Sequence, residues 1–253
     1  MGNVSFRATS KTFPGKVPVR ALDDITLEIK DGEFVALLGP SGCGKSTLLN
    51  LLAGFETRSG GELTFDGAPI EKPGPDRGVV FQEASLFPWL NVWDNITFGP
   101  RVQGLKLDEY ESKARAMLKL VGLEAFADAL PAQLSGGMRQ RVGIARVLVM
   151  SPRALLMDEP FGALDAQTRL AMQQLLLDVW QSLGTTVLFV THDIDEAILL
   201  SDRICVMSAR PGRIMRTIPI ALARPRSISS LTSAEFVAYK AAIMADMKVE
   251  TIA

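Results

Sequence analysis

The sequence contains few cysteines and no hydrophobic run long enough to cross a membrane. Its two cysteines, Cys43 and Cys205, provide no disulfide framework, which is typical of proteins from a reducing compartment. No apolar stretch approaches the length of a transmembrane helix. The N-terminal residues lack the basic and apolar regions of a signal peptide. We therefore expect any role at a membrane to depend on a partner.

The chain also lacks an excess of either charge. It has 253 residues and a formal net charge of −1, and a chain of this length can bury a sizeable core. A near-neutral balance argues against a nucleic-acid partner. One stretch departs from it, because six arginines and no acidic residue occur between Arg203 and Arg226. A solvated strand-and-turn region explains this stretch most simply, and a contact with an anionic membrane or a regulatory anion is the alternative.

Four short runs are apolar on both faces, which is typical of buried strands in a parallel sheet covered by helices. The runs are residues 34–38, 78–81, 154–157 and 186–190. They are followed by residues suited to chemistry, namely a glycine-rich loop, Gln82, Asp158 with Glu159, and His192. Because ligands of open α/β sheets bind beyond the carboxyl ends of the strands, we expect these groups to lie together.

Other segments show the periods of antiparallel strands and of helices. Near the N-terminus, Val4, Phe6 and Ala8 alternate with polar residues and are expected to share one face of a strand. Residues 107–120 and 138–150 have apolar residues at helical spacing. We therefore expect an antiparallel β subdomain and a helical subdomain in addition to the parallel sheet.

A glycine-rich loop follows the first apolar run and leads into a helical pattern. It fits the form GxxxxGK[ST] and comprises Gly39, Pro40, Ser41, Gly42, Cys43, Gly44, Lys45, Ser46 and Thr47. Backbone N–H groups of such a loop point at phosphate oxygens, Lys45 can reach the β- and γ-phosphates, and the Ser46 hydroxyl can hold Mg²⁺. The loop predicts an α/β fold with a P-loop NTPase core and a mostly parallel sheet.

Candidate catalytic groups lie at the same predicted edge. We expect Asp158 to hold Mg²⁺ and Glu159 to act as a base or to orient the attacking water. The chain's sole histidine, His192, is assigned to the γ-phosphate and this water. Gln82 is a further candidate contact of Mg²⁺ or of the water. Phe13 either stacks on adenine or belongs to the core.

The segment 134–141, Leu-Ser-Gly-Gly-Met-Arg-Gln-Arg, indicates a second anion site. A small hydroxyl residue and two glycines stand before a helical pattern, and helix N-termini bind anions. With this segment, the order and spacing of the motifs resemble the ATP-binding subunit of an ATP-binding cassette (ABC) transporter. The resemblance covers nearly the whole chain and includes the loop of residues 163–165.

The resemblance implies a dimer, because in this family two cassettes pair head to tail around ATP. Its phosphates lie between the phosphate loop of one chain and the Ser-Gly-Gly helix N-terminus of the other. The residues that would meet the nucleotide or the interface from the partner's side are Ser135, Gly136, Gly137, Gln140 and Asp165. Phe13 would take the place of the adenine-stacking aromatic residue, which is often tyrosine in the family.

The resemblance also implies an architecture, partners and a location. It implies one ABC ATPase domain over residues 1–253, with its core at about 1–87 and 151–220, its helical subdomain at about 88–150 and a C-terminal extension at about 221–253. The expected partners are a second cassette, identical or related, transmembrane permease subunits and an extracytoplasmic solute-binding protein. The chain would lie peripherally on the cytoplasmic face of the inner membrane.

A narrower resemblance concerns the transported solute. Residues 75–82 and 86–92 resemble those of importers of nitrate, sulfonate and taurine. In the same region Phe87, Trp89 and Trp93 would suit a groove for a short partner helix. The alternative interpretation places some of these aromatic rings in the core of the helical subdomain.

Three other classes of protein share some of these motifs. Soluble ABC ATPases of DNA repair carry a long coiled-coil insertion, which this chain lacks, and those of translation usually carry two cassettes. A regulatory cassette without hydrolysis would not need Lys45, Glu159 and His192. A P-loop kinase or GTPase would not need the segment 134–141. The expected activity is therefore ATP hydrolysis coupled to transport, with a soluble ABC ATPase as the alternative.

Overall fold

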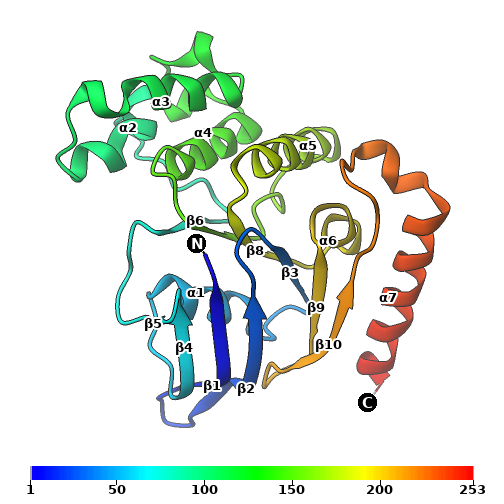
Figure 1. Cartoon of the computed structure of the whole chain (residues 1–253). Coiled ribbons are helices and arrows are strands. Elements are labelled where there is room, and N and C mark those ends of the chain that lie inside the picture. The colour runs from blue at the N-terminus through cyan, green and yellow to red at the C-terminus, as the bar shows by residue number, and fades with distance from the viewer. Residues whose placement is uncertain (1, 253) are drawn as a thin grey trace.

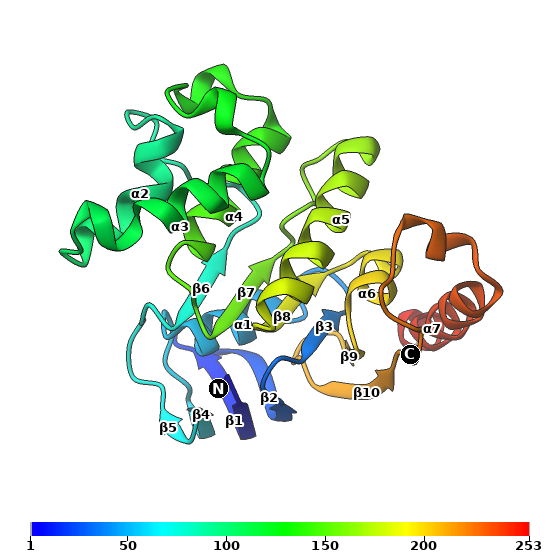
Figure 2. The same cartoon turned by 45° about the horizontal axis from the view of Figure 1, so that its top comes forward.

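Two β-sheets and the helices that cover them make up the molecule, as Figures 1 and 2 show. The computed structural model describes residues 2–252, with side chains for residues 2–245 and 247. The larger sheet contains, in spatial order, β10 (Ile214–Pro219), β9 (Arg203–Met207), β3 (Phe34–Leu38), β8 (Thr186–Thr191), β7 (Ala154–Asp158) and β6 (Arg77–Val80). The smaller sheet contains β2 (Val19–Ile29), β1 (Val4–Phe13), β4 (Gly60–Phe65) and β5 (Ala68–Pro69).

The four apolar runs form neighbouring strands of the larger sheet. β3 pairs in parallel with β8, β8 with β7, and β7 with β6. On the other side β9 is parallel to β3, whereas β10 is antiparallel to β9. The carboxyl ends of β3, β8, β7 and β6 therefore share one edge. The predicted α/β fold, with a mostly parallel sheet and an antiparallel β part, is confirmed.

Helices cover both faces of this sheet, which explains why its strands are apolar on both sides. Phe34, Ala36 and Leu38 belong to the core shared with α5 (Ala166–Leu183) and α6 (Ile194–Leu200). The alternate residues Val35 and Leu37 belong to a second core, shared with α1 (Lys45–Ala53) and the smaller sheet. The two-residue period of a strand thus divides one segment between two cores.

The smaller sheet is antiparallel, as expected, but Ala8 does not lie on the buried face that it was predicted to share with Val4 and Phe6. Val4 and Phe6 are buried, whereas Ala8 is exposed and has a φ of 47°. The pairing of β1 with β2 shifts register between Phe6 and Thr9, and Thr9 is buried instead. A β-bulge of this kind reverses the alternation, so the prediction for Ala8 is wrong.

A separate core holds the helices α2 (Val92–Val102), α3 (Leu107–Leu120) and α4 (Gly136–Leu148), which lie beyond one end of the larger sheet (Figure 1). The bounds of α3 coincide with the predicted helix. Two short 3₁₀ turns, Glu124–Phe126 and Pro131–Gln133, connect α3 to α4. Because α4 also contacts β6 and α5, it links the helical part to the sheet.

The C-terminal part packs beside α6. It contains a 3₁₀ turn, Ile228–Thr232, and α7 (Ala234–Ile252). Arg226 is buried and donates hydrogen bonds to the carbonyl groups of Ile198 and Ser201, at the end of α6. It thereby satisfies carbonyl groups that a helix end leaves without partners. Among the described residues, no helix has the length and hydropathy needed to span a membrane.

Candidate active site

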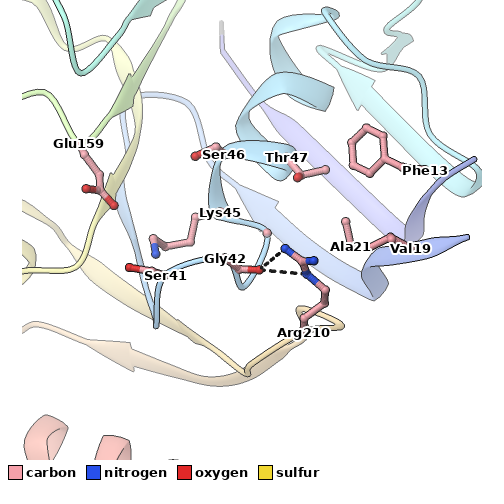
Figure 3. A pocket seen from close by; sticks show the side chains of 11 residues that line it. Phe13, Val19, Ala21, Ser41, Gly42, Lys45, Ser46, Thr47, Glu159 and Arg210 are labelled. Atoms are coloured by element: carbon pink, nitrogen blue, oxygen red, sulfur yellow. Dashed lines mark hydrogen bonds between the residues drawn. The ribbon is translucent and has the colours of Figure 1, made fainter. Parts of the chain in front are cut away.

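A cavity of about 330 Å³ lies at the carboxyl edge of β3, between the phosphate loop and the smaller sheet (Figure 3). Residues of the phosphate loop form one wall of it. Phe13, Val19 and Ala21 of the smaller sheet form the opposite wall, and Glu159 and Arg210 also line it. Phe13 is not part of the core, and the ammonium group of Lys11 lies 4.7 Å from the centre of its ring.

The phosphate loop ends at the first turn of α1. Gly44 precedes this helix with a φ of 105°, a conformation that side chains disfavour. Lys45 is buried, and its Nζ donates to the carbonyl oxygens of Gly39 at 2.8 Å and Pro40 at 3.0 Å. The N–H groups of the first helical turn have no intrahelical acceptor, so this wall can bind an anion.

Ser46 and Asp158 form a pair that fits Mg²⁺. The Ser46 hydroxyl donates to Asp158 Oδ1 at 3.0 Å. Burial raises the pKa of Asp158, and its neighbour Glu159 adds to this, whereas the Ser46 hydrogen bond and Lys45 oppose it. A cation beside this carboxylate would stabilise its charged form and so offset the cost of burying it. Hydroxyl and carboxylate oxygens are the ligands that Mg²⁺ prefers.

Glu159 and His192 meet at the edge of the sheet. The Nδ1 atom of His192 lies 3.0 Å from Glu159 Oε2, and since a carboxylate only accepts, Nδ1 carries the hydrogen. The His192 side chain is 61% exposed, so its other nitrogen is accessible to a ligand. Glu159 has a φ of 44°, a strained conformation that is frequent at functional sites.

Gln82 does not line the cavity of Figure 3, but its amide lies near Gly162, where an added Cβ atom would be 3.2 Å from Gln82 Nε2 and 3.9 Å from Glu159 Oε2. It lines a second hollow of about 460 Å³, together with Gly136, Gln140 and Leu164. It is exposed and follows the end of β6 by two residues. Its roles at Mg²⁺ or at the attacking water remain predictions.

The N-terminus of α4 also faces this second hollow and not the cavity of Figure 3. Ser135 caps the helix by accepting a hydrogen bond from Met138 N at 3.2 Å. A side chain at Gly137 would meet Thr168 of α5 at 2.3 Å, so close helix packing explains this glycine. At Gly136 the nearest atom would be 4.0 Å away, so packing within the chain leaves that glycine unexplained.

Side chains of α4 hold the segment that follows β6. Gln140 is buried, and its amide donates to the carbonyl oxygen of Phe81 at 3.1 Å. The guanidinium group of Arg146 donates to the carbonyl oxygens of Ala84 and Ser85 at 2.9 and 3.0 Å. Within the chain, Gln140 therefore serves to position this segment, and its predicted contact with nucleotide stays a prediction.

Asp165 begins α5 on the surface. Its carboxylate accepts from Thr168 N at 3.0 Å, and hydrogen bonds to Thr168 lower its pKa. Arg169, one turn later, donates to the carbonyl oxygen of Leu164 at 3.1 Å and lies 3.6 Å from the carboxylate of Asp193. Arg169 thus joins the loop before α5 to the loop of His192. Sequence analysis did not identify Arg169, although a residue four positions after Asp165 on a helix is expected to lie on the same face as Asp165.

A buried carboxyl group lies behind His192, and sequence analysis missed it too. Glu196 is 5% exposed and accepts hydrogen bonds from Thr191 Oγ1 at 2.7 Å and Gln173 Nε2 at 3.1 Å. Burial raises its pKa, with the charge of Asp193 adding to this, while the two hydrogen bonds and Arg169 oppose it. An acidic residue in the first turn of a helix is so common that the sequence does not single it out.

The aromatic residues after Gln82 divide between surface and core. Trp89 is 72% exposed. The ring of Phe87 lies 5.7 Å from that of Trp89 and 4.4 Å from that of Phe98. Trp93 packs against the core of the helical part, as the alternative interpretation held. We call Phe87, Trp89 and Phe98 the aromatic patch.

We predict that Glu196→Gln changes the pH dependence of stability. A carboxyl whose pKa is raised by folding binds its proton more tightly in the folded chain, so its contribution to stability falls as pH rises from about 4.3. The unfolding free energy of Glu196→Gln relative to wild type should therefore rise from about pH 4 to about pH 7. Urea unfolding measures it, with Glu235→Gln, an exposed site, as control. A difference that stays constant over this range would contradict the prediction.

Comparison with known proteins places this geometry in a family. A family model described as ABC transporter matches residues 22–162. The ABC transporter ATP-binding protein MJ0412 of Methanocaldococcus jannaschii is 50% identical over 92% of this chain and 86% of its own. The taurine import ATP-binding protein TauB of Pseudomonas aeruginosa is 48% identical over 88% of this chain and 86% of its own.

A solved structure agrees with the sequence relatives. The dimeric post-hydrolysis structure of the ATP-binding cassette MJ0796, bound to ADP and Pi, superposes with a TM-score of 0.76 at 34% identity. The match covers 87% of this chain and all of that one. With the phosphate loop, the Glu159–His192 pair and the N-terminus of α4 in place, this chain belongs to the ABC transporter family and is an ATP-binding cassette with ATPase activity.

Proposed function

We propose that this chain hydrolyses MgATP as half of a head-to-tail dimer and thereby drives uptake of a small solute through separate membrane subunits. The observation that carries the proposal is that the phosphate loop and Glu159 line one cavity, with His192 hydrogen-bonded to Glu159. A phosphate-binding wall and a carboxylate able to orient water thus meet at one place, as phosphoryl transfer to water requires.

Each wall of the cavity has a role in this proposal. Phe13 stacks on adenine, while Lys45 and the loop amides hold the β- and γ-phosphates. Ser46 and Asp158 hold Mg²⁺, which neutralises charge that develops on the phosphates. Glu159 orients the attacking water and accepts its proton. His192 keeps that carboxylate in place through Nδ1 and reaches the γ-phosphate with its other nitrogen.

The partner cassette supplies the other half of the site. In this chain the N-terminus of α4 does not line the cavity of Figure 3, and Gly136 is open to an approaching group. Ser135, Gly136 and Gly137 would close over the γ-phosphate held by the partner, with Asp165 at the same interface. The dimeric form of the related cassette MJ0796 supports this arrangement.

The aromatic patch is proposed as the contact with membrane subunits. It is continuous with the segment that Gln140 and Arg146 of α4 hold, so movement of α4 during dimer closure would reach it. In this proposal residues 88–150 act as the helical subdomain, residues 1–87 and 151–220 as the core, and residues 221–253 as an extension. The chain would lie at the cytoplasmic face of the inner membrane.

The solute is proposed to be a small anion or zwitterion of the sulfonate, taurine or nitrate type. Support comes from the taurine import relatives, which are 48 to 54% identical to this chain. Permease subunits and an extracytoplasmic solute-binding protein complete the proposed importer. A soluble ABC ATPase without membrane partners is the second candidate, but it leaves the exposed Trp89 without a role.

Glu159→Gln should lower the ATPase rate by about 100-fold or more, because a positioned base contributes roughly this factor. ATP binding should remain, since the amide keeps the size of the side chain, and the ATP-bound dimer should accumulate. Phosphate release and size-exclusion chromatography with ATP measure the two effects. Glu124→Gln, an exposed change in the helical part, is the control. A variant that turns over ATP at the wild-type rate would contradict the proposed role of Glu159.

The head-to-tail arrangement predicts complementation between two inactive variants. Lys45→Ala disables the phosphate loop, and Ser135→Arg disables the N-terminus of α4, so each alone should lack cooperative hydrolysis. A mixed dimer keeps one site in which both halves are wild type. Mixing the two purified variants should therefore restore part of the ATPase activity. If each site were built from a single chain, the mixture would stay inactive.

Trp89→Ser should uncouple hydrolysis from transport. The side chain is exposed, so its loss should leave the fold and the ATPase rate of the isolated chain unchanged, while uptake falls with the lost partner contact. Uptake of labelled taurine by cells whose own gene is replaced measures this. Val102→Ser, 69% exposed on α2, is the matched control. Normal taurine uptake by Trp89→Ser cells would contradict the proposal that the aromatic patch contacts the membrane subunits.

A further inference from the structure

The loop between β9 and β10 forms a fixed border of the nucleotide cavity. Gly212 packs so closely on the phosphate loop that a Cβ atom there would lie 2.0 Å from the carbonyl oxygen of Cys43. Gly212 N donates to Ala21 O at 2.9 Å, and Asp23 N donates to Gly212 O at 3.0 Å. The backbone of this loop is thus attached to both walls of the cavity.

Four of the six arginines of this basic stretch are held by groups of the chain itself, three of them by carboxylates. Arg203 pairs with Glu33, Arg213 with Asp23, and Arg224 with Asp202; Arg226 is buried against carbonyl groups. The structure therefore gives these four a structural role, and Arg226, which is buried, is not solvated as the simpler interpretation of the stretch expected.

Arg210 differs from these four. It is exposed and lines the nucleotide cavity. Across the part of the chain that the structure describes, no carboxylate lies within ion-pair distance of it. Its Nε and Nη2 donate to the carbonyl oxygen of Gly42 at 3.3 and 3.2 Å, as Figure 3 shows. A fixed positive charge without a carboxylate partner thus stands in a cavity built for an anion.

Figure 3 places this charge relative to the other groups of the cavity. Figure 3 shows Lys45 and Arg210 on opposite sides of Gly42, with Lys45 on the side of Glu159 and Arg210 on the side of Ala21 and Phe13. In the site proposed above, Lys45 would therefore lie at the end of the phosphates where hydrolysis occurs. Arg210 would lie at the other end, where the phosphates join the nucleoside that Phe13 would stack on.

We propose that Arg210 is a further nucleotide-binding residue, whose guanidinium group holds the α-phosphate of ATP or ADP. This inference rests on the function proposed above. The hydrogen bonds to Gly42 use Nε and Nη2, so Nη1 is left to donate to a phosphate oxygen. Guanidinium groups suit this task because they are always charged and form directional hydrogen bonds to phosphate.

A brace for the phosphate loop is the competing role for Arg210, and two substitutions separate the roles. Arg210→Gln keeps a donor for the Gly42 carbonyl oxygen and removes the charge. Arg210→Lys keeps the charge and loses the fork of donors. Arg213→Gln removes one charge from the same loop at a side chain outside the cavity, and is the matched control.

The experiment measures dissociation constants of ATP, ADP and adenosine by isothermal titration calorimetry. Arg210→Gln should weaken ATP and ADP by similar factors of about five to ten, as expected for one charge-assisted hydrogen bond in an open site. Arg210→Lys should lose less, and adenosine should bind all variants alike. Arg213→Gln should bind ATP within about twofold of wild type. Thermal unfolding confirms that each variant folds.

Three outcomes would overturn the inference: ATP affinity of Arg210→Gln within about twofold of wild type, an equal loss for adenosine, or an equal loss in Arg213→Gln. If Arg210→Gln does not fold, Arg210→Lys decides, because it keeps the charge and loses the fork that holds Gly42: ATP and ADP affinities within about threefold of wild type support the inference, and a larger loss points to the brace and contradicts it. Lys45→Ala separates the two proposals, because ATP affinity unchanged in that variant would refute the nucleotide cavity itself.

Discussion

The parallel pairing of β3, β8 and β7 is the constraint on which the rest of the structure depends. Parallel strands end at the same edge, so three turns far apart in the sequence deliver Lys45, Glu159 and His192 to one place. The pairing requires strands that are apolar on both faces, because helices cover both sides of the sheet. The same requirement that buries the strands therefore assembles the site.

Burial near this edge also sets the electrostatics of the site. Asp158 and Glu196 are carboxyl groups whose pKa values are raised by burial, one beside the phosphate loop and one behind His192. A nearby cation would stabilise the charged form of Asp158, so Asp158 and Ser46 together fit a site for Mg²⁺. Glu196 is held by Thr191 and Gln173, and the strand end that carries His192 is ordered by this buried network.

The helical part carries residues proposed to contact the partner cassette and the membrane subunits. α4 contributes Ser135 at its N-terminus, and along its length it holds the segment after β6 through Gln140 and Arg146. One rigid element thus touches both the proposed dimer interface and the proposed membrane contact. In this view the site is complete only when a second cassette faces the first, and closure of the dimer is what the membrane subunits would sense.

The sequence by itself determined the motifs, the strand ends and the fold class, because glycine-rich loops and doubly apolar strands have strong local patterns. It also supported the family, through the segment 134–141. It did not reveal the bulge at Ala8, the network of Arg169 and Glu196, or the different position of Arg210 among six arginines. Those features depend on contacts between segments distant in the chain. Only the tertiary structure decides which arginine meets a carboxylate and which faces the cavity, because burial and pairing are properties of the packed molecule.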